Sequence, residues 1–333
     1  MKKKTIIILV ILVVLGLLGT LGLLALLNSR TANTEAVRIY LPEGTTYEAL
    51  CDSIDASSTS QLSPFTFHLI ARAFNIDEHV RPGSYVIEPH MPTLALVRKL
   101  RNGQQDPIRL TIGKFRTPNQ LNDYLNKKLM HDTFDFTLST FHLVLPDTYE
   151  VYWTVTPEQF MQRMEDEYNR FWTTTVGPQG ELRCDLLELS DYGNARLETI
   201  ILASIVEEET NNNQEKPLIA SVYLNRLERG MPLQADPTVK YAVGDFTLRR
   251  ILHKHLATES PFNTYLHAGL PPAPICLPSK ATIDAVINAK ETNYLYFCAS
   301  PDMDGTHRFA ATLAEHNRNA AAFHRALAAK GIR

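Results

Sequence analysis

The longest uncharged stretch of the chain constrains its fold more than any other feature. Residues 5–27 read TIIILVILVVLGLLGTLGLLALL and contain no Asp, Glu, Lys or Arg. A helix of this length crosses the hydrocarbon core of a bilayer, which is roughly 30 Å thick. We therefore predict a transmembrane helix here, within an N-terminal segment that spans residues 1–28.

A cleaved signal peptide is the alternative for this segment. The apolar region of a signal peptide is shorter, about 7–15 residues, and is followed by a small-residue cleavage site. The sequence after residue 27, NSRTANTEA, offers no clean site of that kind. Three lysines at positions 2–4 precede the apolar run, whereas only Arg30 follows it closely. The positive-inside rule then predicts a cytoplasmic N-terminus, with the rest of the chain outside.

Charge and cysteine content exclude two classes of function. The chain has 33 basic and 36 acidic residues, so it lacks the basic field of a nucleic-acid-binding protein. Its cysteines are widely scattered, and none forms the CxxC spacing of a zinc site. They are Cys51, Cys184, Cys276 and Cys298. We expect free thiols, although an outward-facing domain could also form disulfides.

The first part of the exterior has the pattern of a small α+β module. Alternating apolar residues predict a strand at 37–41, and PEGTTYEAL predicts a turn into a helix. Residues 64–74 and 93–103 are helix candidates, with a short strand in RPGSYVIEP between them. A strand, two helices, a strand and a helix in about 70 residues indicate a compact module, which we place at 36–105.

A connecting α+β region is expected at 106–190, before a catalytic domain at 191–333. Residues 106–112 favour a strand, and 117–129 and 156–172 favour helices that begin with Thr-Pro. The polar stretch 173–183 is predicted to be a loop. The predicted fold class is therefore α+β, with a mixed α+β catalytic domain after the module.

The sequence LETIILASIVEEETNNN, residues 197–213, combines an apolar helix with three consecutive glutamates. Its apolar residues cover most of the helix circumference, so we expect a central helix. Glu209 follows the stripe of Ile205 and Val206, while Glu207 points about 200° away. Burial would raise the pKa of Glu209 and suit it to donate a proton near neutral pH. The alternative is a solvated helix end without catalytic function.

Several separated motifs resemble, in the same order, the endolytic murein transglycosylase (YceG-like) family. They are LPDTYE, ASIVEEET, LQADPTVKY, SPFNTY, GTHRF and EHN. The resemblance covers nearly all of the exterior and is strongest from Leu145 onward. It implies a lyase without a cofactor that cleaves peptidoglycan between N-acetylmuramic acid and N-acetylglucosamine, leaving 1,6-anhydro ends. It also implies a LysM-like first module, an inner-membrane location with a periplasmic catalytic domain, and cell-wall synthases as partners.

The resemblance carries roles onto particular residues. Glu209, followed by Thr210, matches the catalytic acid/base, and Glu207 matches a second glutamate that orients a neighbour or the substrate, or forms a structural ion pair. Further residues are expected to bind sugar hydroxyls or to position the acid. They are Gln234, Asp236, Thr238, Ser260, Asn263, Tyr265, His307, Glu315, His316 and Asn317. No HExxH or comparable spacing occurs, even around His253 and His255, so no metal is expected.

Two other functions stay open from the sequence. The chain could be a membrane-tethered scaffold that binds peptidoglycan without cleaving it, in which the three glutamates are structural. It could also be a hydrolytic muramidase, which needs a second carboxylate about 5 to 9.5 Å from the first. Asp236 is the candidate for that carboxylate.

Overall fold

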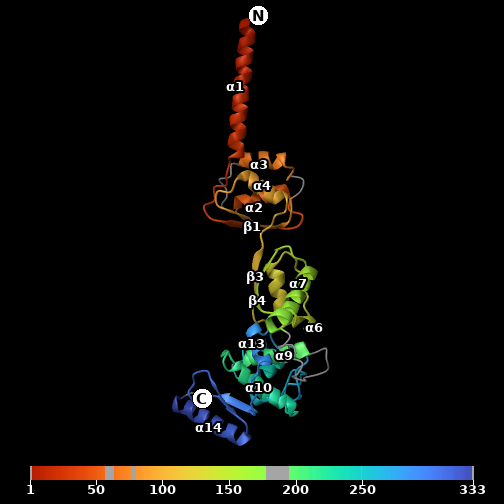
Figure 1. Ribbon diagram of the computed structural model, residues 1–333, viewed down its shortest axis with the longest axis vertical. Coiled ribbons are helices and arrows are strands. Elements are labelled where there is room, and N and C mark those ends of the chain that lie inside the picture. The colour runs from red at the N-terminus through yellow and green to blue at the C-terminus, as the bar shows by residue number, and fades with distance from the viewer. Residues whose placement is uncertain (1, 57–63, 77–79, 178–194, 249, 332–333) are drawn as a thin grey trace. The chain divides into compact units, whose positions relative to one another are not determined.

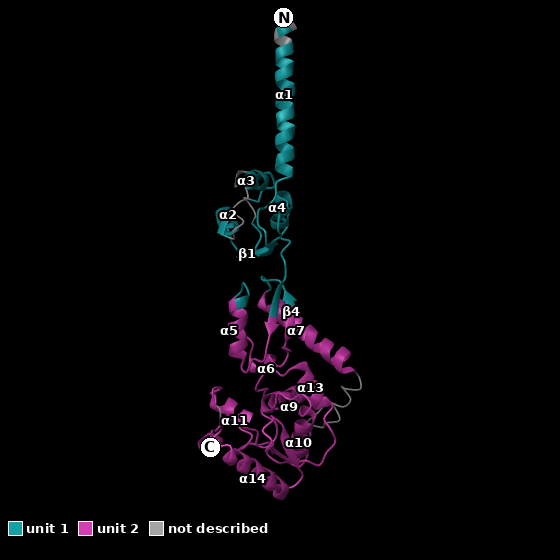
Figure 2. Cartoon of the chain, turned by 90° about the vertical axis from the view of Figure 1, so that its left-hand side faces the viewer, with its two compact units in different colours: residues 1–110, 128–131, 150–155 teal, residues 111–127, 132–149, 156–333 magenta. Residues whose placement is uncertain are grey.

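The computed structural model describes residues 2–56, 64–76, 80–177, 195–248 and 250–331 (Figure 1). Helices and two-stranded sheets alternate along the chain, which confirms the predicted mixed α+β class. The chain divides into two compact units, coloured separately in Figure 2. Unit 1 contains residues 1–110, 128–131 and 150–155, and unit 2 contains the remainder.

The N-terminal helix α1 (Lys2–Leu27) contains the expected apolar segment. Within it, Ile6–Leu27 is a 22-residue stretch with a mean hydropathy of 3.1. None of this stretch is buried against the rest of the chain. Its length and composition are therefore those of a candidate membrane span.

The rest of unit 1 is built around a two-stranded antiparallel sheet. Strand β1 (Val37–Leu41) pairs with β2 (Gly83–Ile87), so that Val37 lies opposite Ile87. The helices of this unit are α2 (Tyr47–Ile54), α3 (Pro64–Ala73) and α4 (Thr93–Arg101). The predicted order of strands and helices is confirmed, and both strands and all three helices contribute to one apolar core.

Unit 2 begins with elements that include both predicted Thr-Pro helix starts. Strands β3 (Ile108–Ile112) and β4 (Asp147–Val151) pair, and the division between the units passes through both. The helices here are α5 (Pro118–Lys128), α6 (Leu138–Phe141) and α7 (Pro157–Arg170). The Thr117 hydroxyl accepts the Gln120 N–H, and the Thr156 hydroxyl accepts the Gln159 N–H. Each threonine thus satisfies a donor that a helix start leaves free.

The loop predicted at 173–183 is wrong at its beginning. Helix α7 continues without a break into a π-helical segment, η2 (Phe171–Val176). The reason is burial, because the rings of Phe171 and Trp172 lie in the core of unit 2 and hold the chain against it. Residues 178–194, which include the rest of that loop, the predicted boundary at 190/191 and Cys184, lie outside the described residues.

The central element of unit 2 is the helix α9 (Ala195–Glu209), as the sequence predicts. Every residue from Thr199 to Val206 is buried, and α9 packs against α10, α11 and α13. The surrounding helices are α10 (Lys216–Glu228), α11 (Asp236–Val243), α12 (His253–Leu256) and α13 (Lys280–Ile287). The unit ends with the antiparallel strands β5 (Tyr296–Ala299) and β6 (His307–Ala310) and the helix α14 (Leu313–Ala329).

The three cysteines in the described part of the chain are free thiols. Cys276 is buried in unit 2, while Cys51 and Cys298 are half-buried. Burial raises the pKa of the Cys276 thiol well above its usual value. A thiol in this state is a weak nucleophile, so Cys276 acts as a small apolar core residue.

Candidate active site

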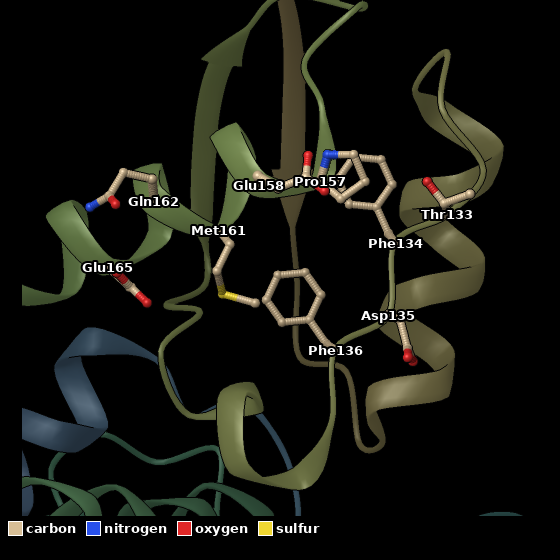
Figure 3. Close-up of a pocket in the computed structure, with 9 residues that line it drawn as sticks. All are labelled: Thr133, Phe134, Asp135, Phe136, Pro157, Glu158, Met161, Gln162 and Glu165. Atoms are coloured by element: carbon tan, nitrogen blue, oxygen red, sulfur yellow. The ribbon is translucent and has the colours of Figure 1, made fainter.

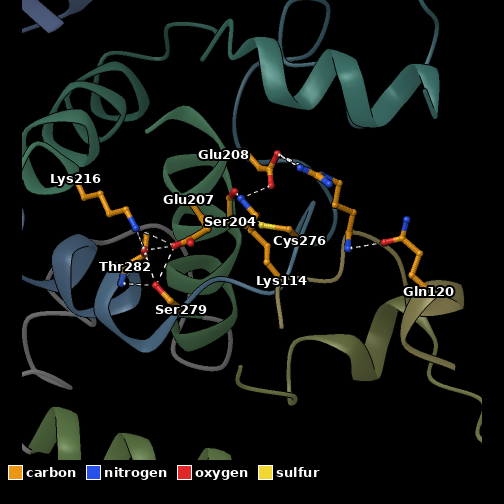
Figure 4. Close-up of polar contacts among 10 residues, drawn as sticks. Lys114, Gln120, Ser204, Glu207, Glu208, Lys216, Cys276, Ser279 and Thr282 are labelled. Carbon is orange, nitrogen blue, oxygen red and sulfur yellow. Dashed lines mark hydrogen bonds and ion pairs between the residues drawn. The ribbon is translucent and has the colours of Figure 1, made fainter. Parts of the chain in front are cut away.

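The three glutamates at the end of α9 contact three different sets of neighbours. Glu208 forms ion pairs with Lys114 and Arg116, each at 3.0 Å. Figure 4 shows this carboxylate on the opposite side of the helix end from that of Glu207. Glu208 is therefore tied to the segment that follows β3.

Glu207 lies in a nearly closed polar cluster with α13 and the start of α10. Lys216 Nζ is 3.1 Å from its carboxylate, and the hydroxyls of Ser279 and Thr282 donate to the same oxygen (Figure 4). Burial alone would raise the pKa of Glu207, but these hydroxyls and the Lys216 charge together lower it below its usual range. Glu207 is therefore ionised at neutral pH and joins three helices.

Glu209 has a different environment, with one hydroxyl and no ion pair among the described residues. The Tyr223 hydroxyl, on α10, donates a 2.6 Å hydrogen bond to Glu209 Oε1. Burial raises the pKa of Glu209 to about 7, against the lowering effect of this hydrogen bond and with a further rise from the Asp236 charge. A substantial fraction of this carboxyl group is protonated near neutral pH.

The Glu209 carboxyl lines an open pocket of about 280 Å³. Five residues expected from the sequence meet there: Glu209, Gln234, Asp236, Tyr265 and His316. Four others complete the lining: Tyr223, Arg226, Leu233 and Phe297. The pocket thus combines polar groups that can bind hydroxyls with an apolar wall.

One rim of the pocket is the segment that enters α11. Gln234 has a left-handed backbone, with φ of 50°, and its N–H donates to the Thr264 carbonyl. The Tyr265 hydroxyl donates a 2.7 Å hydrogen bond to Asp236, which orients that carboxylate at the exposed rim. A non-glycine residue in this backbone region is uncommon and requires a supporting environment.

Other predicted residues lie behind this rim rather than at its surface. Thr238 is fully buried; its hydroxyl donates to the Ala235 carbonyl and forms a hydrogen bond with the Thr264 hydroxyl. Asn263 is fully buried and donates to two backbone carbonyls, and Ser260 accepts the Phe262 N–H. These three side chains hold the loops that carry Asp236 and Tyr265.

The predicted residues near the C-terminus separate into different positions. The backbone N–H of His307 donates to Glu215 at 2.8 Å, and its ring Nδ1 lies 2.9 Å from the same carboxylate. Glu315 accepts the Ala311 N–H at the start of α14. His316 lines the pocket and stacks on Tyr296.

Asn317 is exposed on α14. Thr210 is buried directly after α9, where its hydroxyl accepts the Asn212 N–H.

Burial and the Arg226 charge lower the pKa of His316, so its imidazole is neutral at pH 7. Within the described residues, no group of three or more His, Cys, Asp or Glu side chains could hold a metal ion.

A comparison with protein families identifies the chain. The YceG-like family model matches residues 39–322, which is most of its length. The chain belongs to the YceG-like family.

Relatives of this YceG-like chain carry the name endolytic murein transglycosylase. The protein of that name from Bacillus subtilis is 33% identical over 198 residues, which cover 59% of this chain and 49% of the relative. The one from Streptococcus pneumoniae serotype 2 is 36% identical over 128 residues, covering 37% of this chain and 23% of the relative. The matched part thus spans at most about half of these relatives.

A solved structure shares the fold. The crystal structure of a YceG-like protein from Listeria monocytogenes aligns with a TM-score of 0.53 at 24% identity. The alignment covers 86% of this chain and 99% of the Listeria chain. The likeness extends over both units of the YceG-like fold.

Two polar pocket residues of this YceG-like protein, besides the apolar Leu233 and Phe297, are missing from the sequence-based candidates. Tyr223 and Arg226 lie on α10, in the segment ASVYLNRL, which the sequence marks only as an amphipathic helix. A buried tyrosine hydroxyl needs a hydrogen-bond partner, and this rule is the signal that could have drawn attention to Tyr223. Arg226 donates to the carbonyls of Leu233 and Leu295, each at 2.7 Å, and to that of Pro232.

Proposed function

We propose that this YceG-like protein is a peptidoglycan lytic transglycosylase in which Glu209 is the catalytic acid/base. The observation that carries the proposal is a carboxyl group with a pKa of about 7 that lines an open pocket and forms no ion pair with any described residue. A general acid works best when its pKa lies near the working pH. The name shared by the bacterial relatives supports the same activity.

The proposed reaction needs one carboxyl group and no water. Protonated Glu209 donates its proton to the oxygen between N-acetylmuramic acid and N-acetylglucosamine, and the bond from that oxygen to C1 of the muramyl sugar breaks. The resulting carboxylate takes the proton of the muramyl 6-hydroxyl as O6 bonds to C1. The products are a free 4-hydroxyl on one fragment and a 1,6-anhydro ring on the other. Glu209 is protonated again at the end.

The neighbours of Glu209 are assigned supporting roles in this proposal. Tyr223 holds the carboxyl oxygen through its 2.6 Å hydrogen bond. Asp236, Tyr265, Gln234 and His316 line the pocket and would bind the sugars. The buried Thr238, Ser260 and Asn263, together with Thr210, would keep the pocket loops in place.

The polar contacts near the pocket support a positioning role for the remaining predicted residues. Glu207 joins α9 to α10 and α13, and would fix the end of the helix that carries Glu209. The pair of His307 and Glu215 joins β6 to the start of α10, the helix that carries Tyr223. Glu315 and Asn317 would complete the wall formed by α14.

We also propose the envelope location and the domain organisation expected from the sequence. Residues 1–28 would anchor the chain in the inner membrane with the N-terminus in the cytoplasm, and 36–105 would form a LysM-like module that contacts glycan. Residues 106–190 would connect it to the periplasmic catalytic domain at 191–333. The lysines at positions 2–4 support the orientation, and the separate core of unit 1 supports an independent module. Peptidoglycan would be the substrate and cell-wall synthases the partners.

Mass spectrometry of digested glycan tests the reaction. The full chain in detergent, incubated with uncrosslinked peptidoglycan, should produce 1,6-anhydromuramyl ends, which are one water lighter than reducing ends. Predominantly reducing ends would instead support a hydrolytic muramidase that uses Asp236, which also lines the pocket, as the second carboxylate. Binding of glycan without any cleavage would support the scaffold alternative.

A further inference from the structure

We propose that a second groove in unit 2 binds an extended peptide segment of a partner protein, in which apolar and basic side chains alternate. This groove, called the α7 groove here, lies between α7 and residues 133–136 and has a volume of about 390 Å³. None of its lining residues belongs to the pocket of Glu209. The proposal therefore does not depend on the proposed reaction.

The floor of the α7 groove is apolar. Phe134 and Phe136 are each only 3% exposed, and both pack edge-to-face on Phe160. Met161 extends from α7 toward the Phe136 ring, as Figure 3 shows, and Pro157 closes the upper end. A methionine side chain adapts its shape easily, so this floor can accept aliphatic side chains of different outline.

One wall of the groove is the extended segment 133–136. The backbone groups of this segment that face α5 form hydrogen bonds with side chains of that helix. Asn122 and Asn126, one turn apart on α5, accept the N–H groups of Phe136 and Phe134 at 2.7 and 2.9 Å. The asparagine amides also donate to the carbonyls of the same two phenylalanines. One helical turn is about 5.4 Å and two extended residues are about 6.6 Å, so these bonds hold the segment in a strand-like conformation.

The other side of this segment has free backbone groups. In an extended chain the N–H and C=O groups of successive residues point to opposite sides, so those of Thr133 and Asp135 point away from α5. Neither residue has a backbone hydrogen bond to any other described residue. An unpaired strand edge of this kind is a template for a further strand, which binds through main-chain hydrogen bonds.

The rim of the groove selects the charge of the added strand. Asp135, Glu158 and Glu165 line the groove, and no lysine, arginine or histidine does. Asp135 and Glu165 form no ion pair with any described residue. A strand that places apolar side chains on the floor and lysines or arginines at the rim would match both features.

A sugar chain fits this groove less well than a peptide. The phenylalanine rings are almost completely buried, so they do not present open faces on which a pyranose could stack. The free N–H and C=O groups of Thr133 and Asp135 are spaced for a second backbone. The partner is therefore identified by its chemistry as a protein with a basic, amphipathic strand.

The test uses the full chain in detergent and a fluorescein-labelled peptide of the sequence KVKLKVK. We expect saturable binding with a Kd on the order of 10–100 µM, measured by fluorescence anisotropy. The matched peptide EVELEVE should bind at least about tenfold more weakly. Asp135→Lys combined with Glu165→Lys should weaken KVKLKVK by about tenfold and reverse the preference. The same charge change at Asp123, exposed on α5 outside the groove, is the control and should have little effect.

Strand pairing is tested separately by N-methylation of alternate peptide amides. One of the two possible sets should lose binding by at least about tenfold, because its N–H groups would face Thr133 and Asp135, and the other should keep it. Equal binding of both charged peptides, or equal weakening by the Asp123 control and the double variant, would overturn the proposal. So would insensitivity to both sets of methyl groups, or displacement of the peptide by a chitin oligosaccharide. Met161→Glu, which places a charge on the floor, should reduce binding without changing glycan cleavage.

Discussion

Glu207 and Glu209 lie two residues apart at the end of one helix, yet their surroundings give them opposite properties. Around Glu207, a buried lysine and two hydroxyls compensate for the loss of water, and the pKa falls. Around Glu209, one tyrosine hydroxyl does not compensate for burial, and the pKa rises to about 7. Burial alone does not decide whether a carboxyl group is a stabilising anion or a proton donor.

The difference arises from the elements that pack against each side of α9. Helix α13 brings Ser279 and Thr282 to Glu207, and the start of α10 adds Lys216. The middle of α10 brings the Tyr223 hydroxyl and the charge of Arg226 toward Glu209, and together they do not offset its burial. The ionised Glu207 therefore stabilises the structure. The buried Glu209 stays available as a proton donor, and its burial lowers the stability of the fold.

The largest expected effect separates the two glutamates in catalysis. Glu209→Gln keeps the shape of the side chain but removes the transferable proton, so the rate of glycan cleavage should fall by at least about 10²-fold. Glu208→Gln is the matched control, because it makes the same change at a carboxylate that pairs with Lys114 and Arg116 instead of lining the pocket. Near-normal cleavage by the Glu209 variant would assign the acid to another residue.

The second effect distinguishes Glu207 from Glu209 by the stability of the fold. Glu207→Gln leaves the Lys216 ammonium, which is 4% exposed, without its counter-ion, and should lower the free energy of unfolding by about 3 kcal/mol. Urea denaturation of the full chain in detergent measures this change in the free energy of unfolding. Adding Lys216→Met to the same chain should restore most of the loss, since the uncompensated charge is then gone. If Glu207→Gln alone were as stable as the parent chain, the polar cluster around Glu207 would not stabilise the fold.

The third effect is a pH dependence of opposite sign at the two positions. The raised pKa of Glu209 means that its ionisation costs stability progressively between pH 4.5 and about 7. At pH 8, the Glu209→Gln variant should therefore unfold at higher urea than the parent chain. Its free energy of unfolding should be about 2 kcal/mol larger, after allowance for the partial exposure of this carboxyl group. At pH 4 the two chains should be equally stable.

Glu207 has a lowered pKa, so it stabilises the fold above pH 4.5 and this contribution is lost as the pH falls through its folded value. The deficit of Glu207→Gln should accordingly be largest at neutral pH and shrink in acid. Urea titrations of both variants at several pH values would show the two trends. Parallel trends would mean that the two carboxyl groups share one kind of environment.

The smallest effect concerns the single hydrogen bond to Glu209. The Tyr223 hydroxyl lowers the pKa of that carboxyl group, so Tyr223→Phe should raise it further. The alkaline limb of kcat/KM against pH should move upward by about 0.5 to 1 pH unit. A merely structural role for Tyr223 would lower the rate without moving this limb.

The sequence predicts the position of Glu209 on its helix, but it does not predict which residues contact the glutamates. Helix periodicity is sufficient for α9, because its unbroken buried run leaves little ambiguity about where the apolar stripe ends. The cluster around Glu207 could not be predicted in this way. Ser279 and Thr282 lie 72 and 75 positions away along the chain, and their contact depends on the packing of α13 against α9.

Burial also explains why one local pattern failed and how two predicted site residues are placed. The polar TTTV sequence predicted a loop, but the preceding Phe171 and Trp172 anchor the chain in the core and continue the helix. Thr238 and Asn263 are buried and form hydrogen bonds inside the protein, as expected of residues that support the pocket loops. A polar side chain identifies a donor or acceptor, whereas its partner is determined by the tertiary structure.

The contacts of Arg226 have a consequence for sequence variation. Among the described residues, its guanidinium group donates only to main-chain oxygens, those of Pro232, Leu233 and Leu295. These hydrogen bonds do not depend on which side chains stand at the three positions, although the buried Leu233 and Leu295 must stay apolar. Position 226 itself has no such freedom, because lysine lacks the planar fork that reaches all three carbonyls. Apolar substitutions in the loops beside the pocket are therefore compatible with these hydrogen bonds, whereas replacement of Arg226 is not.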